Sequence, residues 1–207
     1  MQQIYPTFDR LPRLSLPPLP PLLVTGAFFA SVDAFLQVWF NPAVETVTYI
    51  ALGSNLGDRE LNLLLAVAEL GKTPGCRVTA LSRFYETSPI GMASDTPAFV
   101  NAVARLATTL TPGDLLKELQ RIERERFGRT PSGHPVSRRM DLDLLLYGDN
   151  QLETPELIIP HPRMTTRRFV LLPLSDIAAD LREPVSKRTI TELLTDLQSD
   201  DRVTPLE

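Results

Sequence analysis

The chain has 207 residues, 43% of them hydrophobic and 22% charged, which is enough apolar material for one or two globular domains and excludes a wholly disordered protein. Its formal net charge of -4 excludes a protein that binds nucleic acid or an anionic membrane through overall charge, so any polyanion must be bound locally. The single cysteine, Cys76, excludes an intramolecular disulfide and a cysteine-based zinc site, and we expect it to be structural in a reducing cytoplasm.

Residues 1–45 differ in composition from the rest of the chain. A proline-rich run, LPRLSLPPLPPLL, leads into an apolar stretch over residues 24–40. A membrane-spanning helix needs about 20 apolar residues, and Asp33 interrupts this stretch. We therefore predict a loosely attached extension, or a start codon assigned too far upstream, before a folded domain over residues 46–207. Alternatives are a membrane-associating arm, or docking of its aromatic residues onto the core or another subunit.

The folded domain is expected to begin with a strand and a helix. Residues 47–52 are β-branched and apolar, which predicts a buried strand ending at Gly53. The following turn, GSNLGD, lacks the lysine and hydroxyl of a Walker loop, so we interpret it as a tight turn with Asp58 as a helix N-cap. The helix should end near Gly71. Its predicted buried face follows the i, i+3, i+4, i+7 spacing of Leu61, Leu64, Leu65 and Ala68.

Two strands, over residues 77–85 and 98–109, are expected next, separated by a loop rich in serine, proline and glycine. We expect them to pair as antiparallel neighbours. Thr111 then resembles an N-cap with proline at the first helical position, and the helix should end close to Gly128. The buried face of this helix is predicted to consist of Leu115, Leu119 and Ile122.

The last predicted elements are a strand over residues 140–147 and a short helix over residues 169–179. The leading order βαββαβ predicts an α+β sandwich of ferredoxin-like type, with helices packed on one face of a mainly antiparallel sheet. The tail after residue 200 is expected to be frayed.

The string RRMDLDLLLY, residues 138–147, is the most informative for chemistry. Because side chains alternate along a strand, Asp141 and Asp143 should share one face, with their Cα atoms about 6.5 to 7 Å apart. Two carboxylates so placed suit Mg²⁺, which completes its shell with substrate phosphates. The alternative is a pair of solvated aspartates on an exposed face. The core face is predicted to consist of Leu142, Leu144 and Leu146.

Arginines are dense around these aspartates, and arginine grips phosphate oxygens bidentately. The group consists of Arg124, Arg126, Arg129, Arg138, Arg139, Arg163, Arg167 and Arg168. Any one of them can instead pair with a surface glutamate. His161 begins a loop after a short apolar run, where its ring can donate to a phosphate or make a structural hydrogen bond. For His134 we favour a structural role.

Over about residues 48–191 the sequence resembles the 6-hydroxymethyl-7,8-dihydropterin pyrophosphokinase family. The segments that carry the resemblance occur in order as ALGSNLGDR, FYETSPIG, FVNAV, the helix end from RIE to GR, RRMDLDLLLYG and IPHPRMTTRRFVLLPL. The resemblance implies transfer of the terminal diphosphate of ATP to the pterin hydroxymethyl group, with attack at the β-phosphorus and release of AMP. It also implies two Mg²⁺ ions on Asp141 and Asp143.

The family also implies roles for individual side chains. Arg138, and Arg129 on a mobile loop, are implied to act on the phosphates. Residues implied to bind ATP are Gln120, Glu123, Arg138, Leu144, His161 and Arg167. The pterin ring is implied to stack between Phe99 and Phe169 with its edge on Asn101, an arrangement that suits a flat heteroaromatic ring. Further pterin contacts are implied from the loop residues Thr87, Ser88 and Ile90.

The sequence departs from the family pattern in the mobile loop. Pro131 stands where the family has a second arginine, and Pro135 stands where it usually has a tryptophan. Pro162 replaces a tyrosine that often follows the histidine. One extra residue before Gly128 leaves open which of Glu123 and Glu125 lines the ATP site. Closure of this loop over ATP is therefore the least secure part of the resemblance.

Three other functions are compatible with parts of this pattern. A nucleotidyl transferase or cyclase can also place two carboxylates on a ferredoxin-like sheet, and it would release pyrophosphate. An RNA-binding module of this fold is disfavoured because paired aspartates repel phosphate unless a metal intervenes. The third is a degenerate homologue that binds pterin without turnover. We expect a monomer whose partners are ATP and the pterin, with no nucleic acid and no membrane.

Overall fold

The computed structural model describes residues 45–88, 96–128, 137–199 and 201–206. The predicted extension, residues 1–45, therefore lies outside the described residues except for Glu45. The centre of the fold is an antiparallel sheet in the order β5-β1-β4-β3-β8, with β2 also paired to β4. The strands are β1 (Thr46–Ser54), β2 (Cys76–Leu81), β3 (Tyr85–Thr87), β4 (Phe99–Thr108), β5 (Asp141–Tyr147) and β8 (Val203–Pro205).

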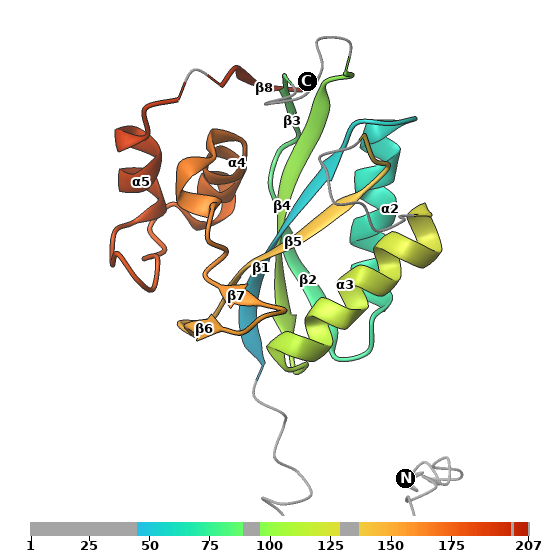
Figure 1. Ribbon diagram of the computed structural model, residues 1–207, viewed down its shortest axis with the longest axis horizontal. Coiled ribbons are helices and arrows are strands. Elements are labelled where there is room, and N and C mark those ends of the chain that lie inside the picture. Colours follow the sequence, from blue (N-terminus) through green and yellow to red (C-terminus); the bar gives the residue numbers. More distant parts are fainter. Residues whose placement is uncertain (1–44, 89–95, 129–136, 200, 207) are drawn as a thin grey trace, which may run out of the picture. The chain divides into compact units, whose positions relative to one another are not determined.

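Helices cover both faces of this sheet (Figure 1). On one face lie α2 (Arg59–Lys72) and α3 (Pro112–Phe127), as predicted, and on the other lie α4 (Arg168–Ala178) and α5 (Ile190–Asp196). The expectation of helices on a single face thus holds only for α2 and α3. A small hairpin of β6 (Leu152–Glu153) and β7 (Ile158–Ile159), followed by a 3-10 turn (Met164–Thr166), joins β5 to α4. The predicted α+β architecture with a mainly antiparallel sheet is confirmed.

Local capping explains the boundaries of α2 and α3. The Asp58 side chain accepts a hydrogen bond from the Leu61 backbone N–H at 3.0 Å, as an N-cap should. The Thr111 hydroxyl accepts from the Asp114 N–H at 3.2 Å, with proline following directly after the cap. Gly128 ends α3 in the left-handed conformation, with φ at 67°, which a glycine adopts without strain. These predicted boundaries are confirmed.

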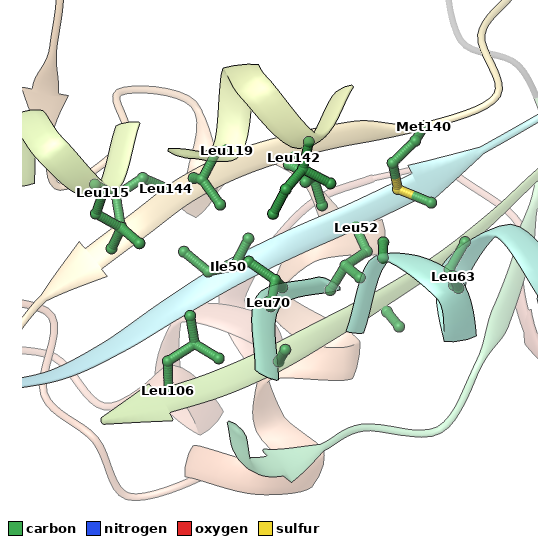
Figure 2. Packing of buried hydrophobic residues seen from close by; sticks show 14 of the residues in the cluster. Ile50, Leu52, Leu63, Leu70, Leu106, Leu115, Leu119, Met140, Leu142 and Leu144 are labelled. Atoms are coloured by element: carbon green, nitrogen blue, oxygen red, sulfur yellow. The ribbon is translucent and has the colours of Figure 1, made fainter. Parts of the chain in front are cut away.

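The predicted buried face of α2 is wrong for Leu61, Leu64 and Ala68, whereas Leu65 is partly buried against the core. Leu61 and Leu64 are 49% and 51% exposed. The side chains that pack on the sheet are instead Leu63, Ala66 and Leu70, each 0% exposed. Because α2 carries apolar residues on both sides, two rows have helical spacing, and only contact with the sheet selects between them. Figure 2 shows Leu63 and Leu70 in the cluster that includes Ile50 and Leu52 of β1.

This correction gives a direct stability test. Leu63→Ala is expected to lower the free energy of unfolding by about 2–5 kcal/mol, because it leaves a cavity in the core. Leu61→Ala, the matched control on the row predicted from sequence, should change it by no more than about 0.5 kcal/mol. Denaturant titration of both variants measures the difference. Equal losses would contradict the observed packing.

The predicted strand over residues 77–85 is interrupted. The break lies at Ser82, whose hydroxyl accepts a hydrogen bond from the Val103 N–H at 2.9 Å, so that β2 and β3 form separate strands. Both still pair antiparallel with β4, as expected. The predicted fraying of the tail is also wrong, because β8 pairs with β3 and the Leu206 N–H donates to the Phe84 carbonyl at 2.9 Å. The hydrogen-bond partners of β8 lie on the edge of β3, and a strand of three residues is too short for its sequence to predict such pairing.

Strand β5 also departs from the predicted alternation. The register with β1 shifts between Tyr49 and Ile50, which are paired with Leu146 and Leu144. The extra residue turns Leu146 to the face covered by α4 and α5, so its predicted place beside Leu142 and Leu144 is wrong. The two aspartates precede this bulge, where the alternation is regular.

Candidate active site

A cavity of about 160 Å³ opens beside strands β1, β4 and β5 and the start of α4. Most of the residues predicted to act on substrate line it, although they come from segments far apart in the sequence. The lining consists of Ala51, Leu52, Gly53, Thr87, Ser88, Phe99, Asn101, Ala102, Arg138, Asp141, Asp143, Arg167, Phe169 and Val170. The fold therefore brings the predicted pterin residues and the predicted metal ligands into one space.

Asp141 and Asp143 lie together on one side of this cavity. They stand opposite Gly53 and Ala51 of β1, and their side chains are 28% and 40% exposed. The Arg138 guanidinium donates to Asp141 Oδ1 at 2.7 Å. That of Arg167 lies 4.0 Å from Asp143 Oδ2. Two carboxylates and two guanidinium groups in this arrangement suit a phosphate-containing ligand that binds together with a metal cation.

The donor set fits Mg²⁺ better than a transition metal. Among the described residues no group of three or more histidine, cysteine, aspartate or glutamate side chains forms a cage for a metal. Mg²⁺ does not need one, because it binds through one or two carboxylates and takes its other ligands from water and substrate phosphates. The pair Asp141 and Asp143 meets that requirement.

A second cavity, of about 270 Å³, shares Asp143 with the first. Leu144 and His161, both predicted to bind ATP, line it. The rest of its lining was missed by sequence reasoning and consists of Leu116, Leu142, Pro155, Glu156, Leu157, Ile158 and Pro162. The β6 and β7 hairpin that supplies several of these residues has strands of two residues each, too short for a periodic pattern. The adjacent apolar residues Leu157 and Ile158 were the one local feature that could have indicated a buried wall here.

His161 lines the second cavity, and one of its ring nitrogens already accepts a hydrogen bond. Its backbone N–H donates to the Leu145 carbonyl at 2.9 Å, and its Nδ1 accepts from the Arg163 N–H at 3.1 Å. Burial lowers the pKa of His161, the nearby Asp143 carboxylate raises it, and the guanidinium groups of Arg167 and Arg163 lower it again, for a net lowering. With Nδ1 accepting, the proton of the neutral ring resides on Nε2.

Two aromatic side chains and a buried amide also line the first cavity. Phe99 of β4 and Phe169 of α4 both line it, and the Arg167 guanidinium carbon lies 5.4 Å from the centroid of the Phe169 ring. Asn101 is buried, and its Nδ2 donates to the Thr87 hydroxyl at 2.7 Å. A Cβ on Gly53 would lie 3.0 Å from Asn101 Oδ1, so glycine here leaves room for that amide.

Several predicted residues are placed elsewhere or lie outside the described residues. Gln120 is exposed on α3 and lines neither cavity. Glu123 is buried, and its Oε1 accepts from the Leu142 N–H of β5 at 2.8 Å, whereas Glu125 pairs with Arg121 on the exposed side of α3. Outside the described residues lie Ile90, Arg129, Pro131, His134 and Pro135.

Among the described members of the predicted arginine group, only some line the two cavities. Arg138 and Arg167 line the first. Arg126 lies 3.8 Å from Glu69, and Arg124 lies 3.8 Å from Glu125, so both take part in surface ion pairs. Arg139 and Arg163 are exposed. The alternative role, pairing with a surface glutamate, therefore applies to Arg124 and Arg126.

Comparisons with known proteins agree on one family. A family model described as 7,8-dihydro-6-hydroxymethylpterin-pyrophosphokinase matches residues 49–179. The 2-amino-4-hydroxy-6-hydroxymethyldihydropteridine pyrophosphokinase of Bacillus subtilis is 43% identical over 150 residues, covering 72% of this chain and 89% of the relative. The protein of that name from Pseudomonas aeruginosa is 45% identical over 146 residues, covering 70% and 88%.

Solved structures share the fold at low sequence identity. An HPPK-DHPS structure in complex with substrates has a TM-score of 0.59 and 13% identity, covering 73% of this chain and 43% of that one. Wild-type HPPK-DHPS of Plasmodium falciparum with pteroate has a TM-score of 0.57 and 15% identity, covering 73% and 44%. This chain therefore spans less than half of either solved chain. In the described part of the chain, no helix has the length and apolar character needed to cross a membrane.

Proposed function

We propose that Asp141 and Asp143 hold magnesium for the reaction of the family to which this chain belongs, the 7,8-dihydro-6-hydroxymethylpterin-pyrophosphokinase family. That reaction transfers pyrophosphate from ATP to hydroxymethyldihydropterin in folate biosynthesis. The observation that carries the proposal is the shared cavity. Both carboxylates line the same space as Phe99, Phe169 and Asn101. Donor and acceptor substrates therefore meet beside the acids.

The two cavities suggest a path for ATP. We propose that its base enters the second cavity beside Leu144, with the phosphates passing Asp143 into the first. His161 donates from Nε2 to a phosphate oxygen, and Arg138 and Arg167 neutralise phosphate charge. Magnesium, when bound, shields the charge on the phosphate oxygens. Glu123 holds β5 in place through Leu142, and Gln120 and Arg129 remain predicted contacts.

The pterin is positioned for attack from the other side. Phe99 and Phe169 stack on its ring, and the buried Asn101 amide reads its edge. Thr87 fixes that amide, while Ser88 and Ile90 remain predicted loop contacts. The hydroxymethyl oxygen bonds to the β-phosphorus as the bond from that phosphorus to the oxygen bridging to the α-phosphate breaks, and AMP leaves with the bridging oxygen. The hydroxyl proton is released.

The test is AMP formation with ATP, Mg²⁺ and hydroxymethyldihydropterin, assayed with and without the pterin. We expect AMP only when the pterin is present, because attack at the β-phosphorus requires its hydroxyl. Pyrophosphate release would instead indicate a nucleotidyl transferase or cyclase. Wild-type protein no faster than an Asp141→Ala, Asp143→Ala double variant would indicate a homologue that binds pterin without turnover. Equal activity of a chain starting near Val44 would show that residues 1–45 are dispensable.

We further propose that the protein acts as a monomer in the cytoplasm. Cys76 supports this setting, because it is half-buried and its sulfur lies 3.2 Å from the Thr108 hydroxyl oxygen. Burial raises the pKa of the Cys76 thiol, which keeps it protonated and unreactive. Light scattering after size exclusion determines the oligomeric state.

A further inference from the structure

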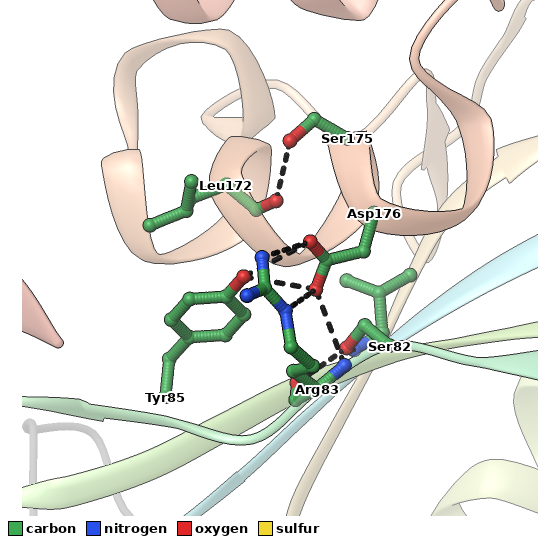
Figure 3. A network of polar contacts seen from close by, with 7 residues as sticks. Ser82, Arg83, Tyr85, Leu172, Ser175 and Asp176 are labelled. Carbon is green, nitrogen blue, oxygen red and sulfur yellow. Dashed lines mark hydrogen bonds and ion pairs between the residues drawn. The ribbon is translucent and has the colours of Figure 1, made fainter. Parts of the chain in front are cut away.

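A polar cluster joins α4 to the junction between β2 and β3, on the face of the sheet that carries the active site. Asp176 of α4 is at its centre (Figure 3). Its side chain is 14% exposed, although the residue as a whole lies at the surface. Its carboxylate accepts from the Arg83 N–H at 3.2 Å, from Arg83 Nη2 at 2.8 Å and from the Tyr85 hydroxyl at 2.9 Å. One side chain thus ties a helix to a strand more than 90 residues earlier in the sequence.

The cluster lies on the same helix face and the same strand face as the predicted pterin slot. Asp176 follows Phe169 by seven residues, which is about two helical turns, or roughly 10 Å along one face of α4. On β3, Tyr85 and Thr87 are two residues apart and therefore point to one face. Phe169 and Thr87 line the cavity, whereas Asp176 and Tyr85 bond to each other.

Strand β3 also contacts Asn101, whose side-chain amide is proposed to hydrogen-bond the edge of the pterin ring. Tyr85 pairs with Asn101 in the sheet, and the Thr87 hydroxyl accepts from the Asn101 side chain at 2.7 Å. Because Thr87 of β3 holds the side chain of Asn101 on β4, a displacement of β3 relative to α4 would move that amide relative to Phe169. The Tyr85 to Asp176 contact is positioned to prevent that displacement.

The contact to Tyr85 matters more than the ion pair. Arg83 is 65% exposed, so solvent screens its attraction to Asp176. Tyr85 is 1% exposed, and a buried hydroxyl that loses its partner carries a desolvation cost. Burial raises the pKa of Asp176, but hydrogen bonds from Arg83 and Tyr85 lower it by more, so the carboxylate is charged at neutral pH.

We propose that Asp176 is a positioning residue that sets the separation of Phe169 and Asn101 through Tyr85 and thereby determines affinity for the pterin substrate. Asp176 does not line either cavity, so its effect on the ligand is indirect. This inference rests on the proposed function only for the identity of the ring that the slot accepts.

The experiment compares Tyr85→Phe, Asp176→Asn and Asp176→Ala with wild type. Tyr85→Phe keeps the ring and loses one hydrogen bond, so we expect pterin Kd and KM to rise about fivefold. Asp176→Ala should raise the pterin Kd and KM further. Asp176→Asn keeps an acceptor for Tyr85, so its pterin Kd and KM should lie between those of Asp176→Ala and wild type. The KM for ATP should stay within about twofold, because the second cavity does not adjoin this cluster.

Ser175→Ala is the matched control, since among the described residues the Ser175 hydroxyl bonds within α4, to the Leu172 carbonyl at 2.7 Å (Figure 3). It should leave pterin Kd unchanged. Pterin Kd is measured directly by fluorescence, and thermal melting confirms that each variant is folded. Variants that lower only the melting temperature, or that weaken ATP and pterin equally, would overturn the inference. Wild-type protein that forms no AMP would instead contradict the proposed function, while the Kd comparison would still test the positioning role.

Discussion

Replacing Asp141 or Asp143 by asparagine is expected to lower kcat for AMP formation by about 10³-fold or more. A metal ligand contributes several kcal/mol to the stabilisation of transition-state charge, and each loss of about 1.4 kcal/mol is a factor of ten in rate. Asparagine keeps the shape of aspartate, so the packing of β5 against β1 should persist. The loss should appear mainly in kcat, because the proposed pterin contacts of Phe99, Phe169 and Asn101 are unchanged.

Asp149→Asn provides the matched control for these variants. Asp149 is exposed just beyond the end of β5 and lines neither cavity, so its replacement should leave kcat within about twofold of wild type. Mg²⁺ binding in the presence of a non-hydrolysable ATP analogue, followed by calorimetry, gives a readout that does not depend on turnover. Full activity or unchanged Mg²⁺ binding in both active-site variants would contradict the assignment of the metal ligands.

Asn101→Leu is expected to raise the KM for the pterin by about 100-fold. A site built to hydrogen-bond a substrate discriminates strongly, and losing a buried partner costs about 1–3 kcal/mol for each group left unpaired. Leucine is close to asparagine in shape, but it cannot donate to Thr87 or bond the edge of the ring. The effect should fall mainly on the pterin, because Asn101 does not line the second cavity, where we propose that the ATP base binds.

Steady-state kinetics with each substrate varied in turn separates the two affinities. Asn150→Leu, at an exposed position after β5, is the control for the change from amide to aliphatic side chain. An Asn101→Leu enzyme with a normal pterin KM would mean that the amide does not read the ring. A parallel rise in the KM for ATP would show that the substitution disturbs the whole site.

Features that depend on a few neighbouring residues were predicted correctly from the sequence. Asp58 and Thr111 cap their helices because a side-chain oxygen meets a backbone N–H three residues later. Asp141 and Asp143 reach one cavity because strand alternation places them on one face. The resemblance to a family singled out Phe99, Asn101 and Phe169, which no local pattern distinguishes from core residues; all three line the first cavity, and their contact with the pterin stays a prediction.

Features that depend on contacts between distant segments were not available from the sequence. The apolar row of α2 that packs inward was decided by the sheet, and the bulge that turns Leu146 was decided by register with β1. The pairing of β8 with β3, the second cavity beside Asp143, and the bonds of Asp176 likewise join segments brought together only by folding.

The sequence by itself therefore determined the order of helices and strands, their caps and the common face of the two acids, because hydrogen bonds and side-chain periodicity within a few residues set these features. Only the tertiary structure decided which apolar row is buried, where the register shifts and which side chains line the two cavities. Those outcomes minimise exposed apolar area and unpaired polar groups over the whole domain, so they follow from all the packed segments together.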